Sequence, residues 1–278
     1  MACYSFKIKH FPFPNPQILF YLLMVTYFFL PQRPFASALS FNFTKFTSDD
    51  LFYERAFAEE QVIQLTGNKY NSVFEVGRAT YSHPMHLWDS ESRSLTDFTT
   101  NFSFVIDSQN KTNYGDGLAF FLAPDGSRIP NVKEGGAMGL TNDNEPLNST
   151  DNPFVAVEFD IFSNVDPVTK LWDPPGEHVG IDINSMLSVA NVSWSGASTS
   201  VMEGRINEAR ISYNSTSHNL SVLFTGLINN STIEQSLSFN IDLRDHLPEW
   251  VTFGFSAATG GSTAMHTILT WDFSSTDV

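Results

Sequence analysis

The sequence predicts an all-β protein built as a sandwich of antiparallel sheets. After residue 38 the apolar residues recur at every second position or in short runs, and no long stretch has the 3.6-residue period of a helix. The runs are rich in Phe, Val and Ile, and Gly, Pro, Asn, Asp and Ser separate them. Many short strands with turn-rich spacers indicate antiparallel sheets that pack face to face.

The strands can be placed along the chain in order. An alternating strand opens the domain at residues 41–44, and a short helical turn is expected near residues 242–247. We find no internal repeat and no linker, so we expect one domain. The further strand candidates are residues 102–106, 118–122, 155–159, 179–183, 209–213, 220–224, 236–241, 250–256 and 268–273.

Residues 1–38 resemble a targeting segment rather than part of a fold. A basic start precedes an apolar run over residues 18–30, which is about the length of a signal-peptide core and shorter than a membrane span of about twenty residues. Ala36 and Ala38 form a small-x-small cleavage site. We therefore predict a cleaved signal peptide over 1–38 and a mature domain over 39–278; a retained signal anchor is the alternative.

Glycosylation signals support passage through the secretory pathway. The only cysteine, Cys3, lies in the predicted leader, so cysteine usage says nothing about the compartment. Dense Asn-x-Ser/Thr sequons behind a signal peptide predict a secreted glycoprotein, either extracellular or vacuolar. The sequons are at Asn42, Asn101, Asn110, Asn148, Asn191, Asn214, Asn219, Asn229 and Asn230, of which the last two overlap.

The charge excludes two kinds of partner. Three of the fifteen basic residues and none of the thirty acidic residues lie in the predicted leader, which leaves the mature chain with a net charge of −18. Such a chain repels nucleic acid and anionic membranes. We expect no nucleic acid partner and no membrane span in the mature domain. The acidity serves solubility, and some of the carboxylates are candidates for holding metal.

One segment concentrates metal-ligand residue types. Glu158 and Asp160 are two apart on a strand, so both carboxylates point to one face. Asn164 follows in a loop, Asp173 begins an Asp-Pro-Pro turn, and His178 opens the next strand. Calcium takes six to eight oxygens, whereas an imidazole beside carboxylates suits manganese or zinc. Each residue alone has a structural explanation, but their convergence predicts a metal cluster, in which Asp160 could bridge two ions.

A glycosidase is the enzymatic alternative. A Glu-x-Asp pair on a sandwich strand could supply an acid and a nucleophile. The β-sandwich glucanase pattern has a further Glu four or five residues after the first. Phe162 and Ser163 occupy those positions, so we expect no catalysis.

Two glycine-containing segments add further candidates. Asp116 stands between Gly115 and Gly117, just before the strand at 118–122. Gly135 and Gly136 offer backbone N–H groups that no side chain obstructs. Either segment alone also fits an ordinary turn.

Together these motifs resemble the legume lectin family, including the lectin ectodomains of plant receptor kinases. The resemblance runs from about residue 39 to residue 275. It rests on VAVEFD, on WDPP ahead of HVGIDIN, on GDGLAFFLAP and GGAMGL, and on the terminal WVTFGFSAATG and TILTWDFSS. It implies a jelly-roll sandwich with a flat back sheet and a curved front sheet, whose loops carry the site.

The resemblance also implies ligands for two metals. Glu158, Asp160, Asp173 and His178 would bind a transition metal, usually manganese (Mn2+). Calcium (Ca2+) would be bound by Asp160, Asn164, Asp173 and the backbone carbonyl of Phe162.

The same resemblance implies sugar contacts. Asp116 and Asn164 would hydrogen-bond sugar hydroxyls, with help from the backbone N–H of Gly136. Phe162 would offer its ring to the apolar face of the sugar, and a loop near Gly261 and Ser262 would tune the choice of monosaccharide. The peptide bond before Asp116 would be cis.

The chain departs from the family pattern in two places. Gly115 stands where the family usually has Ala. Eight residues, 165–172, separate Asn164 from Asp173, where the family has two to four. Asp166 within this insertion could compete with Asp173 as a ligand, and the insertion puts the affinity for calcium in question. We prefer Asp173, whose spacing to His178 is the family's.

The sequence thus predicts a secreted lectin that depends on divalent metal and binds glycans and glycoproteins. Family members often form homodimers through the back sheet, although glycans at Asn214, Asn219 or Asn229 could cover that surface here. The alternatives are a defence or storage homologue that binds no sugar and a soluble ectodomain of the receptor-kinase type.

Overall fold

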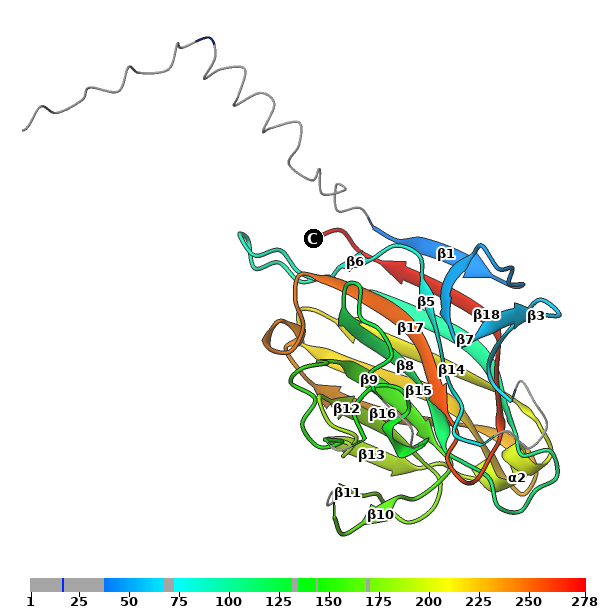
Figure 1. The fold of residues 1–278 in the computed structure, drawn as a ribbon. Helices are drawn as coiled ribbons and strands as arrows, with labels where there is room; N and C mark the ends of the chain where they lie inside the picture. The colour runs from blue at the N-terminus through cyan, green and yellow to red at the C-terminus, as the bar shows by residue number, and fades with distance from the viewer. Residues whose placement is uncertain (1–16, 18–37, 68–72, 132–134, 144, 169–170) are drawn as a thin grey trace, which may run out of the picture. The chain divides into compact units, whose positions relative to one another are not determined.

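The computed structural model describes residue 17 and residues 38–67, 73–131, 135–143, 145–168 and 171–278. Apart from residue 17, the predicted signal peptide up to residue 37 lies outside the described residues. Among the described residues, a pair of antiparallel sheets face each other, which confirms the predicted all-β sandwich (Figure 1).

The front sheet carries the candidate site. Its path runs β13 (Ala190–Ser193), β12 (His178–Ile183), β9 (Val155–Asp160), β8 (Gly117–Pro124), β17 (Trp250–Ala258), β5 (Val76–Tyr81) and β2 (Leu51–Glu54). A short strand, β6 (Met85–His86), pairs with the beginning of β17. Loops on the outer face of this sheet complete the site.

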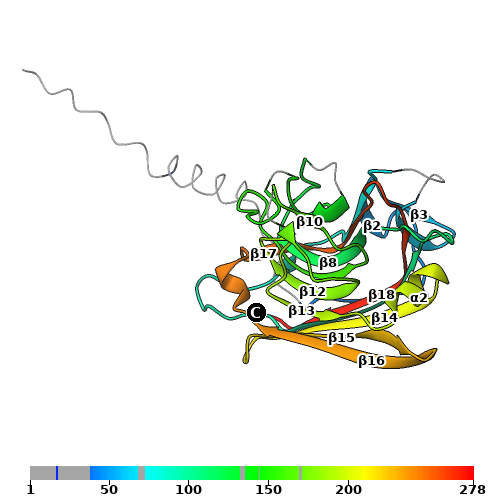
Figure 2. The ribbon, with the colours of Figure 1, turned by 90° about the horizontal axis from the view of Figure 1, so that it is seen from below.

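The back sheet forms the second layer, which Figure 2 shows beneath the front sheet. Its path runs β16 (Ser231–Asn240), β15 (Asn219–Ile228), β14 (Ile206–Asn214), β7 (Phe98–Asp107), β18 (Met265–Ser275), β4 (Val62–Thr66) and β3 (Phe57–Glu59). Off this path, β1 (Ser40–Phe43) pairs with β18.

An aromatic core fills the space between the sheets. Alternate residues of β8 and β9, such as Phe120 and Phe159, point inward into it. Trp271 of β18 is fully buried at its centre, and its ring lies edge-on to Phe255 with centroids 4.9 Å apart. The indole N–H donates to Oγ1 of Thr100 at 2.8 Å, so the polar atom of this large side chain is satisfied.

A second apolar cluster covers the outer face of the front sheet. Phe121 of β8 and Ala156 of β9 face outward, yet both are buried. Met138, Leu140, Phe154 and Leu171 pack over them from the surrounding loops. Strands β8 and β9 are therefore buried on both faces, which is why their sequences read as nearly continuous apolar runs.

The sequence prediction missed several elements. Strand β5 was not expected, because Arg78 interrupts its apolar pattern. The structure buries this arginine, which donates to the Gly139 carbonyl at 2.6 Å and lies 4.5 Å from the ring centre of Phe121. Burial lowers the pKa of Arg78 to about 10. The other unexpected strands are short: β2, β3, β4, β6, β13, and the hairpin of β10 (Val165–Asp166) and β11 (Leu171–Trp172).

One short helix lies between two strands, and the sequence pattern did not predict it. Helix α2 (Ala197–Met202) follows Gly196, and it buries Ala197 and Val201 against the core. Its six residues are too few to show a helical period. The turn expected near 242–247 is the 3₁₀-helix η2 (Leu243–Asp245), whose first backbone N–H groups are capped by Asp242. Among the described residues, no helix has the length and apolarity to cross a membrane.

Candidate functional site

Strand register places the site residues in one row across neighbouring strands, at one end of the front sheet. Ala258 at the end of β17 pairs with Gly117, Gly117 pairs with Asp160, and Asp160 pairs with His178. Asp116 directly precedes Gly117. The pairing of β17, β8, β9 and β12 thus brings Asp116, Asp160 and His178 to the same end of the sheet.

Three metal-ligand side chains converge on the outer face of this sheet. Glu158 and Asp160 alternate with the inward-facing Val157 and Phe159, and His178 lies on the neighbouring strand. One ligand atom from each of Glu158, Asp160 and His178 lies within 4.8 Å of the other two, and all three residues are buried. The Ser188 hydroxyl donates a hydrogen bond to Glu158. The hydroxyl fits there because residue 180 is a glycine, whose Cβ, if it had one, would overlap it.

The carboxylates of this cluster are held in an unfavourable electrostatic setting. Burial raises the pKa of Asp160 well above its usual range, and the charges of Glu158 and Asp173 raise it further. Burial likewise raises the pKa of Asp173 to about 6. Burial also raises the pKa of Asp182, and the charge of the neighbouring Glu158 raises it further. A divalent cation would reverse this cost, so the donor set fits a metal.

The orientation of His178 also fits a metal ligand. Its Nδ1 lies 3.3 Å from the Gly176 carbonyl oxygen, which can only accept a hydrogen bond, so Nδ1 carries a proton. Its Nε2 faces Oε1 of Glu158 at 3.3 Å. Burial works against protonation, but the hydrogen bond and charge of Glu158 outweigh it and raise the pKa of His178. A ring held through Nδ1 presents Nε2 to whatever cation the cluster holds.

The lengthened segment 165–172 does not separate the two predicted calcium ligands that flank it, Asn164 and Asp173. Strands β10 and β11 form a hairpin between Asn164 and Asp173. At its base the Asn164 N–H donates to Oδ2 of Asp173 at 2.7 Å, and the Asp173 N–H donates to the Asn164 carbonyl at 3.0 Å. Within the described residues, Oδ1 of Asn164 is buried without a hydrogen-bond partner. This oxygen and the Asp173 carboxylate are suited to calcium.

The Asp116 carboxylate lies against a glycine-lined backbone. Asp116 is 4% exposed; its N–H donates to the Ala258 carbonyl at 3.1 Å, and its carbonyl accepts from the Ile161 N–H at 2.9 Å. The Gly115–Asp116 peptide bond is cis, as the resemblance implies. A Cβ at Gly135 would overlap the Asp116 carboxylate, and one at Gly136 would lie 2.8 Å from Nδ2 of Asn164. Only glycines allow this close approach.

The remaining predicted sugar-site residues border this centre. Phe162 is partly buried, and its Cβ would lie 3.2 Å from a Cβ at Gly115. Gly261 is exposed, with open space where a Cβ would be, and Ser262 is partly buried. The Phe74 N–H donates to the Gly260 carbonyl at 3.1 Å, and the Phe74 ring is 57% exposed. Phe74 therefore borders the loop that holds Gly261.

Sequence reasoning did not single out Phe74, Asp182 or Ser188. Asp182 carries a signal that could have been used, since it continues the outward alternation of His178 and Gly180 on β12. Phe74 and Ser188 have no such local signal. They reach the site only through loops whose paths the sequence does not define.

The predicted glycosylation sites fall into two groups. Two asparagines are partly buried with their amides engaged: Asn101 donates to Oδ1 of Asp272 at 2.8 Å, and Asn219 donates to Oδ1 of Asn240 at 2.9 Å. The exposed ones are Asn42, Asn110, Asn148, Asn191, Asn214, Asn229 and Asn230.

Comparisons with known proteins agree with this fold. The chain matches the legume lectin domain over residues 38–278. It is 41% identical over 256 residues to Lectin 9 of Medicago truncatula, which covers 87% of this chain and 88% of that protein. It is 43% identical over 200 residues to Agglutinin-2 of Cladrastis kentukea, which covers 72% of this chain but 65% of that protein.

A solved structure gives the same result. Lectin I from Ulex europaeus, in complex with the methyl glycoside of α-L-fucose, superposes with a TM-score of 0.73 at 35% identity. The superposition covers 86% of this chain and 98% of that chain. The fold is thus a β-sandwich of the lectin class. The chain belongs to the legume lectin family, which confirms the family predicted from the sequence.

Proposed function

We propose that this protein is a secreted, divalent-metal-dependent lectin that binds glycans and glycoproteins and catalyses no reaction. One observation supports this most strongly. The Asp116 carboxylate, the Asn164 amide and the Gly135–Gly136 backbone meet in one closely packed place. Through the row of paired strands they adjoin Glu158, Asp160 and His178.

Each sugar contact has a matching group at this place. Sugar hydroxyls both donate and accept hydrogen bonds, and the sugar ring also presents a patch of C–H groups. Asp116 is a charged acceptor, the Asn164 Nδ2 is a donor, and the Gly136 N–H is a backbone donor. The partly exposed ring of Phe162 is an apolar platform. Gly261 and Ser262 border the site and would influence which sugar is accepted.

The metals hold this arrangement together. We assign manganese to Glu158, Asp160, Asp173 and His178, and calcium to Asp160, Asn164, Asp173 and the Phe162 carbonyl. When bound, the ions supply the positive charge that the buried carboxylates lack. Asn164 then has two separate tasks: its Oδ1 faces calcium, and its Nδ2 faces the sugar.

Secretion and assembly are further parts of this proposal. We propose that residues 1–38 are removed as a signal peptide and that exposed sequons carry glycans in the extracellular space or the vacuole. Asn101 lies in the middle of the outer face of the back sheet, in a hollow of about 690 Å³ that Glu208, Arg210 and Asp272 also line. A homodimer across this face requires Asn101 to be unglycosylated.

The function is tested with a glycan array on the purified chain. We expect binding in calcium and manganese, and loss of binding after long incubation with chelator. Asp116→Asn removes the charged acceptor, and about 1.5–3 kcal/mol for a charge-assisted hydrogen bond corresponds to a ten- to hundredfold loss of affinity.

The matched control is Asp125→Asn, at the exposed far end of β8. It should bind like the wild type. Binding that persists in excess chelator would contradict metal dependence, and silence of the folded wild type on the whole array would contradict the lectin assignment.

A further inference from the structure

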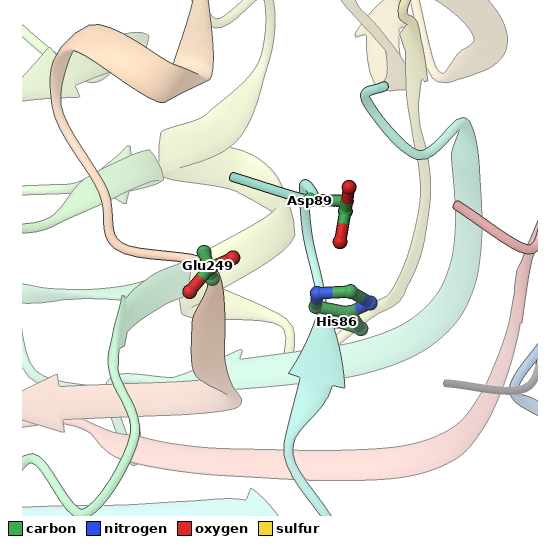
Figure 3. Close-up of side chains that lie close together, drawn as sticks. All are labelled: His86, Asp89 and Glu249. Atoms are coloured by element: carbon green, nitrogen blue, oxygen red, sulfur yellow. The ribbon is translucent and has the colours of Figure 1, made fainter. Parts of the chain in front are cut away.

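A second group of metal-ligand side chains lies at the other end of β17. His86 is the last residue of β6, Asp89 follows three residues later, and Glu249 directly precedes β17. One ligand atom from each lies within 4.8 Å of the other two, and all three residues are partly exposed. Figure 3 shows the two carboxylates turned toward the imidazole from separate segments of the chain.

This group is distinct from the sugar site. His86 pairs with Trp250, the first residue of β17, whereas Asp116 bonds to Ala258, the last. Nine residues of extended strand span roughly 27–30 Å. Figure 1 shows β6 and the β10–β11 hairpin at opposite ends of the front sheet.

Local contacts hold the three side chains in place. The His86 ring stacks on the Trp250 ring, with centroids 4.4 Å apart and planes inclined by 18°. The Ser90 N–H donates to Oε1 of Glu249 at 2.7 Å, and the Ser92 N–H donates to Oδ1 of Asp89 at 2.7 Å. The donors are therefore oriented before any ligand arrives.

An independent observation points to a ligand at this place. Within the stretches of chain that the structure describes, Nδ1 of His86 is buried and has no hydrogen-bond partner. Leaving a buried polar atom unsatisfied is unfavourable, because the atom has lost its hydrogen bonds to water. A metal ion bound through Nδ1 would remove this cost and at the same time offset the two neighbouring carboxylates.

We propose that His86, Asp89 and Glu249 form a second divalent-cation site, of the type that binds zinc. Imidazole nitrogen and carboxylate oxygen are both ligand types that zinc takes, and a water would complete a tetrahedron around three protein ligands. The set supplies too few oxygens for calcium, which takes six to eight. Zinc bonds of about 2.1 Å place tetrahedral donors roughly 3.4 Å apart, so ligand atoms that now lie within 4.8 Å of one another need only a small movement to bind.

The ion would join two segments that the backbone already brings together. The Leu87 N–H donates to the Glu249 carbonyl at 2.7 Å, and the Thr96 N–H donates to the Leu87 carbonyl at 2.9 Å. Zinc would add a cross-link between the loop that Leu87 and Thr96 close and the start of β17. It would thereby stabilise the end of the sheet that lies away from the sugar.

The test is zinc titration by calorimetry of the full chain with calcium and manganese present in excess. His86→Gln removes the imidazole and Glu249→Gln removes a charge while keeping an acceptor for the Ser90 N–H. His83→Gln is the matched control, because His83 is an exposed histidine on the same segment. The wild type and His83→Gln should each bind about one equivalent of zinc. His86→Gln and Glu249→Gln should bind it at least tenfold more weakly.

A second readout separates this site from the sugar site. Zinc should raise the midpoint of thermal unfolding of the wild type and of His83→Gln, but not of His86→Gln. Sugar binding by His86→Gln should equal that of the wild type. Equal zinc uptake by the wild type, His86→Gln and Glu249→Gln would overturn the proposal, as would wild-type uptake accounted for entirely by displaced manganese.

Discussion

Asn164 and Asp173 are joined by two hydrogen bonds, the Asn164 N–H to the Asp173 carboxylate at 2.7 Å and the Asp173 N–H to the Asn164 carbonyl at 3.0 Å. These bonds close the lengthened segment at its base, while Asp166 lies on β10, paired with Leu171. The described ends of the insertion therefore pair with each other, and Asn164 and Asp173 remain adjacent. This geometry favours Asp173 over Asp166 as the calcium ligand.

Asp173→Asn is expected to raise the calcium concentration needed for sugar binding at least tenfold. The amide oxygen still accepts from the Asn164 N–H, so the hairpin stays closed while the site loses a negative charge. Titrating calcium against glycan binding measures the change. Asp125→Asn serves as the control, and a calcium requirement identical to that of the wild type would show that Asp173 is not a ligand.

Gly135→Ala is expected to lower sugar affinity at least tenfold while the domain remains folded. The added methyl group would overlap the Asp116 carboxylate and displace it. Overpacking of this kind costs about 1–3 kcal/mol, or a few degrees in the unfolding midpoint. Gly226→Ala is the comparison, because its methyl group would meet the Gln235 side chain on the back sheet, away from the Asp116 carboxylate. Calorimetry should show the loss for Gly135→Ala alone; similar affinities for the two variants would argue against this close packing.

His266 should make the protein less stable in mild acid. Burial lowers the pKa of His266 to about 3 from an ordinary value of 6.5. As the pH falls below about 6.5, the unfolded chain binds a proton that the folded chain does not. The free energy of unfolding contributed by this group therefore falls between about pH 6.5 and pH 3, by at most about 1.4 kcal/mol per pH unit.

The measurement is urea unfolding as a function of pH for the wild type and His266→Asn. The Asn amide can replace Nδ1 of His266 beside the Thr66 hydroxyl, which lies 2.6 Å from that nitrogen. If the free energy of unfolding of the wild type exceeds that of His266→Asn, the difference should shrink as the pH falls. A difference that is constant from pH 6.5 to pH 4 would rule out this assignment; His83→Asn controls for an exposed histidine.

Trp271→Ala should cost about 3–5 kcal/mol of unfolding free energy, since it removes a fully buried tryptophan from the core. It also leaves Thr100 without the indole donor. Trp172→Ala provides a contrast, because that ring is 56% exposed, and the change should stay within about 0.5 kcal/mol. Chemical denaturation measures both, and similar losses in the two variants would contradict the packing described.

The elements predicted from sequence are those with a local pattern. Short apolar runs predicted β8, β9 and β12, and the two-residue spacing predicted that Glu158 and Asp160 share a face. Strand β5 was missed because Arg78 is polar in sequence but buried in the fold. The meeting of Asp116 with Gly135 and Gly260 depends on pairing among distant strands, which no local pattern encodes.

The two ends of the described domain are bound to each other. Strand β1 pairs with β18 from Ser40 opposite Ser274 to Phe43 opposite Trp271, and the Ser275 N–H donates to the Leu39 carbonyl at 2.9 Å. A short Gly/Ser connector could therefore join the C-terminus to Leu39 without disturbing either sheet. The domain is consequently a good subject for circular permutation, with new ends in the exposed turn at Asn229 and Asn230. In such a variant β1 would be an internal strand of the chain, directly linked to β18.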